Sequence, residues 1–246
     1  MTQNIYDNDA FFAGYSELGR SLEGLDGAAE WPAIQAMLPP MQGLKVADLG
    51  CGFGWFCRWA RGAGAASVLG LDVSDNMLAR ARGFGDDPAI TYGRADLEDL
   101  RLPETEYDLI YSSLTFHYIV GFAGLLARIH AALAAGGRLV FSTEHPIYMA
   151  PSHPRFALDA EGRRIWPIDR YLEEGPRQTD WLAKGVIKQH RTIGTTLNLL
   201  LAAGFTLEHV EEWSPTDAQI AARPALAQER DRPMFLLVAA RKQDGR

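Results

Sequence analysis

Residues 46–56 read VADLGCGFGWF, and this stretch decides how the rest of the chain is interpreted. An apolar run typical of a buried strand ends at Asp48, and Gly50, Gly52 and Gly54 follow at alternate positions. A strand that leads through glycines into a helix brings bare backbone amides and the positive end of the helix dipole beside a ligand. The stretch therefore predicts a ligand that lies directly against this loop.

The sequence around this loop alternates short apolar runs with helix-like segments, which predicts a parallel sheet with crossover helices. Ser74 is expected to cap one helix, and Gly136 and Gly137 are expected to end another. The expected strands cover residues 44–49, 66–72, 89–95, 107–113, 136–144, 205–213 and 233–242, and the expected helices cover residues 54–64, 74–84, 121–137 and 195–205.

Asp72 ends the second expected strand and lies 20 residues after Gly52. A carboxylate about 20 residues after the glycine loop is typical of a group that accepts hydrogen bonds from ribose hydroxyls. In the GxGxxG pattern of dinucleotide-binding folds a third glycine would stand where this chain has Trp55. The spacing therefore indicates a nucleoside ligand and argues against NAD.

Two regions depart from the alternating pattern. Residues 1–43 carry several aromatic side chains and suggest short helices packed outside the sheet. Residues 144–192 contain five prolines and five bulky aromatic residues, which predicts an ordered insertion rather than a linker. Two extended segments are expected there, around a turn at Gly175 and Pro176. The insertion is interpreted as a cap over a ligand site, with packing against another subunit as the alternative.

Five stretches in order carry a resemblance to a known family: VADLGCGFG, GLDVSDNML, GRADLEDL, YDLIYSSLTFHYI and AAGGRLVFSTEHP. They resemble class I S-adenosylmethionine-dependent methyltransferases, whose DxGxGxG loop is reproduced from Asp48 to Gly54. The chain is most similar to the broad type 11 group, which includes the ubiquinone and menaquinone biosynthesis methyltransferases. The resemblance covers residues 44–143.

The resemblance implies an α/β, Rossmann-like class I methyltransferase fold with helices on both faces of a seven-stranded, mostly parallel sheet. Residues 233–242 are expected to form the single antiparallel strand, last but one in the sheet. The chain then divides into an N-terminal helical lid (1–43), a cofactor-binding core (44–143), a cap over the acceptor site (144–192) and a C-terminal helix with two strands (193–246).

The resemblance also implies which residues bind S-adenosylmethionine and its product S-adenosylhomocysteine. The loop would hold the methionine part, Asp72 the ribose, and residues after the second and third strands the adenine, while the N-terminal segment would cover the cofactor. Arg20 would pair with the cofactor carboxylate. The implied cofactor-binding set is Asp48, Gly50, Cys51, Gly52, Asp72, Val73, Met77, Asp96, Leu97, Ser112, Tyr15 and Arg20.

Some of these residues have simpler alternatives. Asp48 is as well suited to orienting the glycine loop as to touching the ligand. Met77 has helical spacing that also suits a core residue, and Asp96 also suits a solvated turn. Cys51 and Cys57 also suit a role as small buried fillers.

Transfer of an activated methyl group requires mainly that the acceptor be aligned and that water be excluded. An oxygen or nitrogen acceptor of high pKa also needs a base. His117 and His145 follow the fourth and fifth expected strands, where open α/β sheets bind ligands, and they are the candidate catalytic residues. A hydrogen-bonded structural role is the alternative for both.

The composition limits the partners. The net charge is −7, and no block of lysine or arginine stands out, which disfavours nucleic acid. Two cysteines without metal-ligand spacing predict neither a disulfide framework nor a metal site. No apolar run is long enough to span a bilayer and no leader pattern is seen, so a cytoplasmic monomer or homodimer without membrane insertion is expected.

The expected function is therefore methyl transfer from S-adenosylmethionine to a small-molecule acceptor that is aromatic or otherwise apolar. Two alternatives remain open from the sequence. One is a catalytically silent protein that binds S-adenosylmethionine or S-adenosylhomocysteine as a regulator. The other is an NAD(P)-dependent oxidoreductase, which the glycine spacing disfavours.

Overall fold

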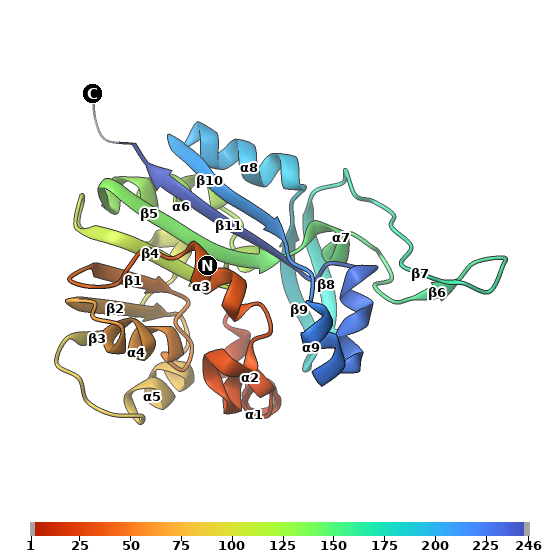
Figure 1. Cartoon of the computed structure of the whole chain (residues 1–246), viewed down its shortest axis with the longest axis horizontal. Coiled ribbons are helices and arrows are strands. Elements are labelled where there is room, and N and C mark those ends of the chain that lie inside the picture. The colour runs from red at the N-terminus through yellow and green to blue at the C-terminus, as the bar shows by residue number, and fades with distance from the viewer. Residues whose placement is uncertain (1–2, 244–246) are drawn as a thin grey trace.

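A computed structural model gives the fold of the chain and describes residues 3–243 (Figure 1). The strands are β1 (Lys45–Leu49), β2 (Ser67–Asp72), β3 (Ile90–Arg94), β4 (Tyr107–Ser113), β5 (Leu133–Glu144), β6 (Ala157–Leu158), β7 (Arg164–Ile165), β8 (Gly175–Trp181), β9 (Ala183–His190), β10 (Phe205–Glu212) and β11 (Phe235–Lys242). The α-helices are α1 (Asp9–Ser16), α2 (Gly19–Leu22), α3 (Trp31–Met37), α4 (Trp55–Gly62), α5 (Asp75–Arg82), α6 (Phe122–Ala132), α7 (Pro146–Met149), α8 (Ile193–Ala202) and α9 (Asp217–Ala222). The short 3₁₀ helices are η1 (Ile5–Asp7), η2 (Gly24–Gly27), η3 (Leu97–Asp99), η4 (Phe116–Tyr118) and η5 (Pro224–Arg230).

The central sheet has seven strands within the described residues, in the order β10-β11-β5-β4-β1-β2-β3. The β1 strand pairs in parallel with both β2 and β4, so Val46 lies between Val68 and Leu109. The β11 strand runs antiparallel to both of its neighbours, β5 and β10. The predicted seven-stranded, mostly parallel sheet is confirmed, including the place of β11 as the last strand but one.

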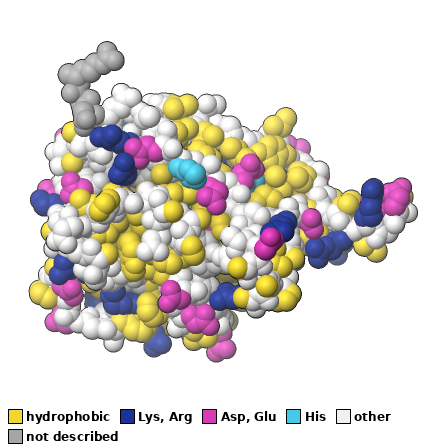
Figure 2. Space-filling view, viewed as in Figure 1, with side chains coloured by type: hydrophobic (Ala, Val, Ile, Leu, Met, Phe, Trp, Pro, Cys, Tyr) yellow, Lys and Arg dark blue, Asp and Glu magenta, His cyan; other side chains and the backbone are white. Residues whose placement is uncertain are grey.

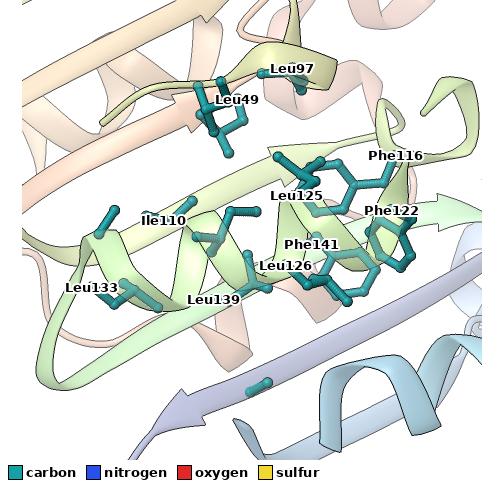
Figure 3. Close-up of a cluster of buried hydrophobic side chains, with 14 of the residues drawn as sticks. Leu49, Leu97, Ile110, Phe116, Phe122, Leu125, Leu126, Leu133, Leu139 and Phe141 are labelled. Atoms are coloured by element: carbon teal, nitrogen blue, oxygen red, sulfur yellow. The ribbon is translucent and has the colours of Figure 1, made fainter. Parts of the chain in front are cut away.

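Side chains alternate across the strands and build a core on each face of the sheet. On one face, the apolar side of α6 packs on β4 and β5, where Phe122 and Leu126 lie close to Phe141 (Figure 3). On the other face, α3 and α4 cover the sheet with Trp31 and Phe56. Because both faces are covered, the central strands are apolar almost throughout, as buried parallel sheets require.

Local sequence explains where the two helices after β1 and β2 begin. Gly54 has a left-handed backbone (φ 69°) and stands directly before α4, which starts at Trp55. The Ser74 side chain accepts a hydrogen bond from the Met77 amide and caps α5. Both helix starts confirm the sequence prediction.

The predicted end of α6 at Gly136 and Gly137 is wrong, because α6 ends at Ala132. Leu133 is already extended and pairs with Tyr107, so the helix ends four residues before Gly136 and the chain then joins the sheet. The register of β4 and β5 then shifts before Leu109 pairs with Arg138. Gly136, with φ 74°, therefore lies in an irregular part of the strand rather than at a helix end.

The predicted turn at Gly175 and Pro176 is also wrong. These residues begin β8, and the β8–β9 hairpin turns instead at Leu182, whose φ is 58°. Together with α7, β8 and β9 lie at the end of the sheet toward which the β5 arrow points (Figure 1). Residues 144–192 therefore form an ordered insertion beside the carboxyl ends of the parallel strands. In residues 3–243, every helix is too short or too polar to cross a bilayer.

Candidate active site

A cavity of about 480 Å³ lies at the carboxyl ends of β1, β2 and β4. Its size falls in the range of small-molecule sites, and this edge of an open parallel sheet is where such folds bind ligands. Two ends can be distinguished. The glycine end is lined by Gly50, Cys51, Gly52, Phe53, Asp72, Val73, Met77, Asp96 and Leu97, and the aromatic end by Tyr6, His117, Tyr118, Glu144, Tyr148, Trp181 and Lys188.

The glycine loop has a backbone that side chains would distort. Gly50 and Gly52 have φ values of 82° and 52°, in the left-handed region. A Cβ atom on Gly50 would lie 2.1 Å from Oγ1 of Thr115, so the protein itself excludes a side chain there. A Cβ atom on Gly52 would meet nothing within 4 Å, because it would point into open space. The backbone at Gly52 is therefore open to the cavity and is not covered by packing.

Gly52→Ala is expected to weaken S-adenosylhomocysteine binding about tenfold or more, because its methyl group would occupy the ligand's space. Gly43→Ala is the matched control, since Gly43 also has a left-handed φ (78°) and open space but lies outside the cavity lining. Both variants should lose about 1 kcal/mol of folding stability to the strained backbone. Calorimetric titration checks this prediction, and equal affinity of the two variants would contradict it.

Asp72 braces the glycine loop from the end of β2. Its Oδ2 accepts a hydrogen bond from the Gly52 amide at 2.9 Å, and its Oδ1 accepts one from the Ser74 amide at 2.9 Å. The side chain is buried, and burial raises its pKa to about 6, against the lowering by these amide hydrogen bonds. Each carboxylate oxygen retains a second lone pair for a ligand hydroxyl.

Asp48 lies deeper, under the loop. Burial raises the pKa of Asp48 to about 7, and its carboxylate accepts a hydrogen bond from Sγ of Cys57 at 3.3 Å. Cys51 and Cys57 are both buried, and Cys51 also lines the cavity. Asp48 thus meets both the cavity and the α4 helix beneath the loop.

The residues expected around the adenine gather at the glycine end. Val73, Met77, Asp96 and Leu97 all line the cavity. Met77 and Leu97 are almost fully buried and form an apolar wall. The Asp96 side chain accepts a hydrogen bond from the Glu98 amide at 3.0 Å and caps η3. This hydrogen bond fixes the position of its carboxylate.

The N-terminal segment closes over this end of the cavity. Asp7 in η1 accepts a hydrogen bond from Oγ of Ser74 and a second from the Asn76 amide at 3.2 Å. Tyr15 and Arg20 line the cavity. Arg20 also donates to Oε1 of Glu30 at 2.9 Å, an internal partner that the sequence analysis did not include.

Two of the expected site residues do not line the cavity. Ser112 is fully buried and donates to the Leu49 carbonyl at 2.7 Å, whereas its neighbour Ser113 lines the cavity. His145 is fully buried, caps α7 through the Ile147 amide and pairs through Nε2 with Glu212 at 2.9 Å. The structure therefore corrects both placements and gives these two side chains structural partners.

His117 does lie at the cavity, in η4 after β4. Burial first, and then the charges of Lys188 and Arg191, hold its pKa well below the usual 6.5, so the ring is neutral at pH 7. The Glu144 amide donates to Nδ1 at 3.4 Å, which assigns the ring proton to Nε2. No residue among 3–243 makes a hydrogen bond to that Nε2.

Lys188 is a site residue that the sequence analysis missed. It is buried in β9 and forms an ion pair with Glu144 at the end of β5. Its signal in the sequence is alternation: Val186, Lys188 and His190 face the same way on the strand and are buried together. A lysine among inward-facing positions marks either an internal ion pair or a ligand site.

Comparison with known proteins identifies the chemistry of this cavity. The profile of the family described as "Methyltransferase domain" matches residues 47–141. An S-adenosylmethionine-dependent methyltransferase of Mesorhizobium loti, solved as a crystal structure, is 68% identical with a TM-score of 0.87; the match covers 89% of this chain and 100% of that one. The chain belongs to the S-adenosylmethionine-dependent methyltransferases.

Two other relatives show how much of the chain is shared with proteins of other organisms. An uncharacterised protein of Haemophilus influenzae is 34% identical over 97% of both chains. The malonyl-[acyl-carrier protein] O-methyltransferase of Enterobacter lignolyticus is 32% identical over 62% of this chain and 54% of its own length. This second match therefore spans about half of that relative.

The cavity of this methyltransferase fits its cofactor. The bare backbone at Gly52, the buried carboxylate of Asp72 and the apolar wall of Met77 and Leu97 suit, in order, the amino-acid, ribose and adenine parts of a nucleoside sulfonium. The enzyme therefore uses S-adenosylmethionine, and the oxidoreductase and silent-regulator alternatives are set aside.

Proposed function

We propose that this methyltransferase transfers the methyl group to a small aromatic or otherwise apolar acceptor bound at the aromatic end of the cavity. The observation that carries the proposal is the lining of that end: Tyr6, Tyr118, Tyr148 and Trp181 surround it in the same cavity as the glycine loop. Aromatic walls bury large apolar area and favour ring-shaped ligands.

In this proposal the glycine end holds the cofactor. Gly50, Cys51 and Gly52 lie against its methionine part, and Asp72 accepts from the ribose hydroxyls. Val73, Met77 and Leu97 enclose the adenine, and Asp96 accepts from its amino group. Arg20 exchanges part of its contact with Glu30 for the cofactor carboxylate, beside Tyr15. When bound, S-adenosylmethionine supplies an electrophilic methyl group on a sulfonium.

The lid and cap exclude water from the transfer. Residues 3–43 are held over the glycine end by the Asp7 contacts with α5, and residues 144–192 supply Tyr148, Trp181 and Lys188 to the aromatic end. Water exclusion strengthens the electrostatic interactions inside the site. In this proposal both segments act on the same bound pair of molecules.

His117 touches the acceptor as a hydrogen-bond donor rather than as a base. A ring held neutral by burial and by nearby positive charge is a poor proton acceptor at neutral pH. Its Nε2–H instead orients an acceptor oxygen. The catalytic contribution of His117 in this proposal is therefore alignment.

A small acceptor also suits the surface. On the face shown in Figure 2, basic and acidic side chains are interspersed rather than gathered into a basic track. The name of the Enterobacter relative points to an acyl-carrier-protein substrate, but that match covers only about half of the relative. The aromatic end, which is lined from within by the lid and cap, supports the smaller acceptor.

Trp181→Leu is expected to weaken binding of 4-nitrophenol to the S-adenosylhomocysteine-loaded enzyme about two- to tenfold, because an aromatic face is worth about 0.5–1.5 kcal/mol. Trp59→Leu is the matched control, since Trp59 packs against Trp31 and lies outside the cavity lining. Calorimetry measures both affinities. Absence of 4-nitrophenol binding to the loaded wild-type enzyme would contradict the proposed acceptor class.

A further inference from the structure

The aromatic end contains one strongly polar feature, the ion pair between Glu144 and Lys188. The two side chains are 14% and 4% exposed, so both charges are largely removed from water. A buried ion pair rarely stabilises a fold relative to apolar residues of similar size, because desolvation offsets the attraction. Its presence at a ligand cavity therefore points to a role in chemistry rather than in stability.

The charges around this pair come from several elements. Glu144 ends β5, Lys188 lies in β9, and Arg191 follows β9. Lys188 and Arg191 help to keep His117 neutral, and the Lys188 ammonium also lies 5.0 Å from the centre of the Trp181 ring. Burial, and then the charge of the Glu144 carboxylate, raise the pKa of Tyr118.

One oxygen of this ion pair and one nitrogen beside it make no hydrogen bond within residues 3–243. Oε1 of Glu144 is used by Lys188, whereas Oε2 accepts no hydrogen bond from residues 3–243. Nε2–H of His117 is similarly free among those residues, and all three side chains line the cavity. These three side chains therefore offer one acceptor oxygen, one neutral donor and one cation.

These three groups together select one kind of functional group. A carboxylate would be repelled by Glu144, a neutral amine has a single lone pair for the two donors, and a ketone has no proton for Oε2. A hydroxyl donates to a carboxylate and accepts from a donor or a cation. The aromatic side chains that line this end favour a ligand in which this hydroxyl is carried on an aromatic ring or a conjugated system.

We propose that the acceptor is a phenol or enol that is methylated on oxygen, with Glu144 as the proton acceptor and Lys188 as the group that stabilises the developing oxyanion. This inference rests on the proposed function. The acceptor oxygen forms a bond to the methyl carbon, and the sulfur–methyl bond breaks with its electron pair going to sulfur. The hydroxyl proton goes to Oε2 of Glu144 and leaves later to solvent, which gives a methyl ether and S-adenosylhomocysteine.

The test uses 4-nitrophenol, whose absorbance distinguishes phenol from phenolate, bound to the full-length enzyme loaded with S-adenosylhomocysteine. Glu144→Gln removes a negative neighbour and should raise the bound phenolate-to-phenol ratio about tenfold or more. Lys188→Met removes a positive neighbour and should lower that ratio by a similar factor. Opposite signs are the expected result, because loss of a purely structural ion pair would not distinguish the two charges.

Three controls make the outcomes decisive. Glu106→Gln removes a carboxylate that pairs with Lys45 outside the cavity, and should leave the ratio unchanged. The double variant Glu144→Gln, Lys188→Met leaves no unpaired buried charge, so it stays testable if a single variant fails to fold. The double variant should prefer 4-nitrophenol over 4-nitroanisole, which has no hydroxyl proton, less strongly than the wild-type enzyme does.

The results separate this inference from the proposed function. If neither nitroaromatic binds to the loaded wild-type enzyme, the proposed acceptor class is wrong, and the inference falls with it. If both bind equally well, or if the two single variants shift the ratio in the same direction or not at all, only the hydroxyl assignment is overturned. Preference for 4-nitrophenol together with opposite shifts supports it.

Discussion

Replacement of Asp72 by alanine is expected to weaken binding of S-adenosylhomocysteine at least about 100-fold. The variant would lose the charge-assisted hydrogen bonds from two ribose hydroxyls to the Asp72 carboxylate, each worth about 1.5–3 kcal/mol. The Gly52 and Ser74 amides would also lose their shared acceptor, which loosens the glycine loop. Asp72→Asn keeps the shape and should show a smaller loss, of about tenfold.

Asp75→Asn is the control for this prediction. Asp75 begins α5, three residues from Asp72, but its carboxylate is two-thirds exposed and pairs with Arg94 outside the cavity. Its removal should leave affinity unchanged in calorimetric titration. A result in which the Asp72 and Asp75 variants bind equally well would show that the ribose is held elsewhere.

The raised pKa of Asp72, about 6, adds a pH dependence to cofactor binding. Hydrogen bonds from hydroxyls favour the ionised carboxylate, so binding releases a proton below this pKa. Affinity for S-adenosylhomocysteine should therefore fall about tenfold between pH 7 and pH 5. Asp72→Asn should show a flatter profile over the same range.

Asp48→Asn is expected to change the pH dependence of folding stability by on the order of 4 kcal/mol. The pKa of Asp48 is about 7 in the folded protein against an ordinary 3.8, because the carboxyl group is buried. Because the pKa is raised in the folded protein, the stability associated with protonated Asp48 is fully present below about pH 4. This stability is lost as the pH rises to about 7. The magnitude follows from about 1.36 kcal/mol for each pKa unit.

Denaturant unfolding of both proteins at pH 4 and pH 8 measures this effect. The free energies of unfolding should be similar at pH 4, and the Asp48→Asn variant should be the more stable at pH 8. Asp72 titrates in both proteins, so most of its contribution cancels in the comparison. A difference that does not change with pH would mean that Asp48 ionises freely in the folded state.

The positions of the strands and the glycine loop were predictable because they follow from local sequence, whereas the seven-stranded sheet with its antiparallel strand was implied by the family resemblance. Apolar runs located the strands, and the glycines at 50, 52 and 54 marked the loop. The separation of 20 residues placed Asp72 opposite Gly52, and the structure joins them by a hydrogen bond. These features depend on periodicity and chain length alone, so a single sequence is sufficient to reveal them.

The aromatic end was less predictable because its contacts join distant segments. Glu144 and Lys188 meet only because the β8–β9 hairpin folds back over η4. Ser112 and Ser113 show the limit of local reasoning. Successive residues on a strand face opposite ways, so proximity in sequence did not decide which serine faces the ligand.

His145 was misplaced for a related reason. Its position after β5 is that expected of a catalytic residue, but Glu212, at the end of β10, and the Ile147 amide occupy both ring nitrogens. The antiparallel pairing of β10 and β11 brings Glu212 to this place, and nothing near His145 in the sequence signals it. The His145 ring therefore caps α7 and is held there by contacts with a distant segment.

The most direct test of the central claim is transfer of a labelled methyl group from S-adenosylmethionine, with the product fractions separated by size. The purified enzyme would be offered small phenolic compounds, acyl carrier protein and transfer RNA in parallel. We expect label in an extractable small aromatic product, with equal release of S-adenosylhomocysteine. Label found only in the carrier protein or the RNA would contradict the claim.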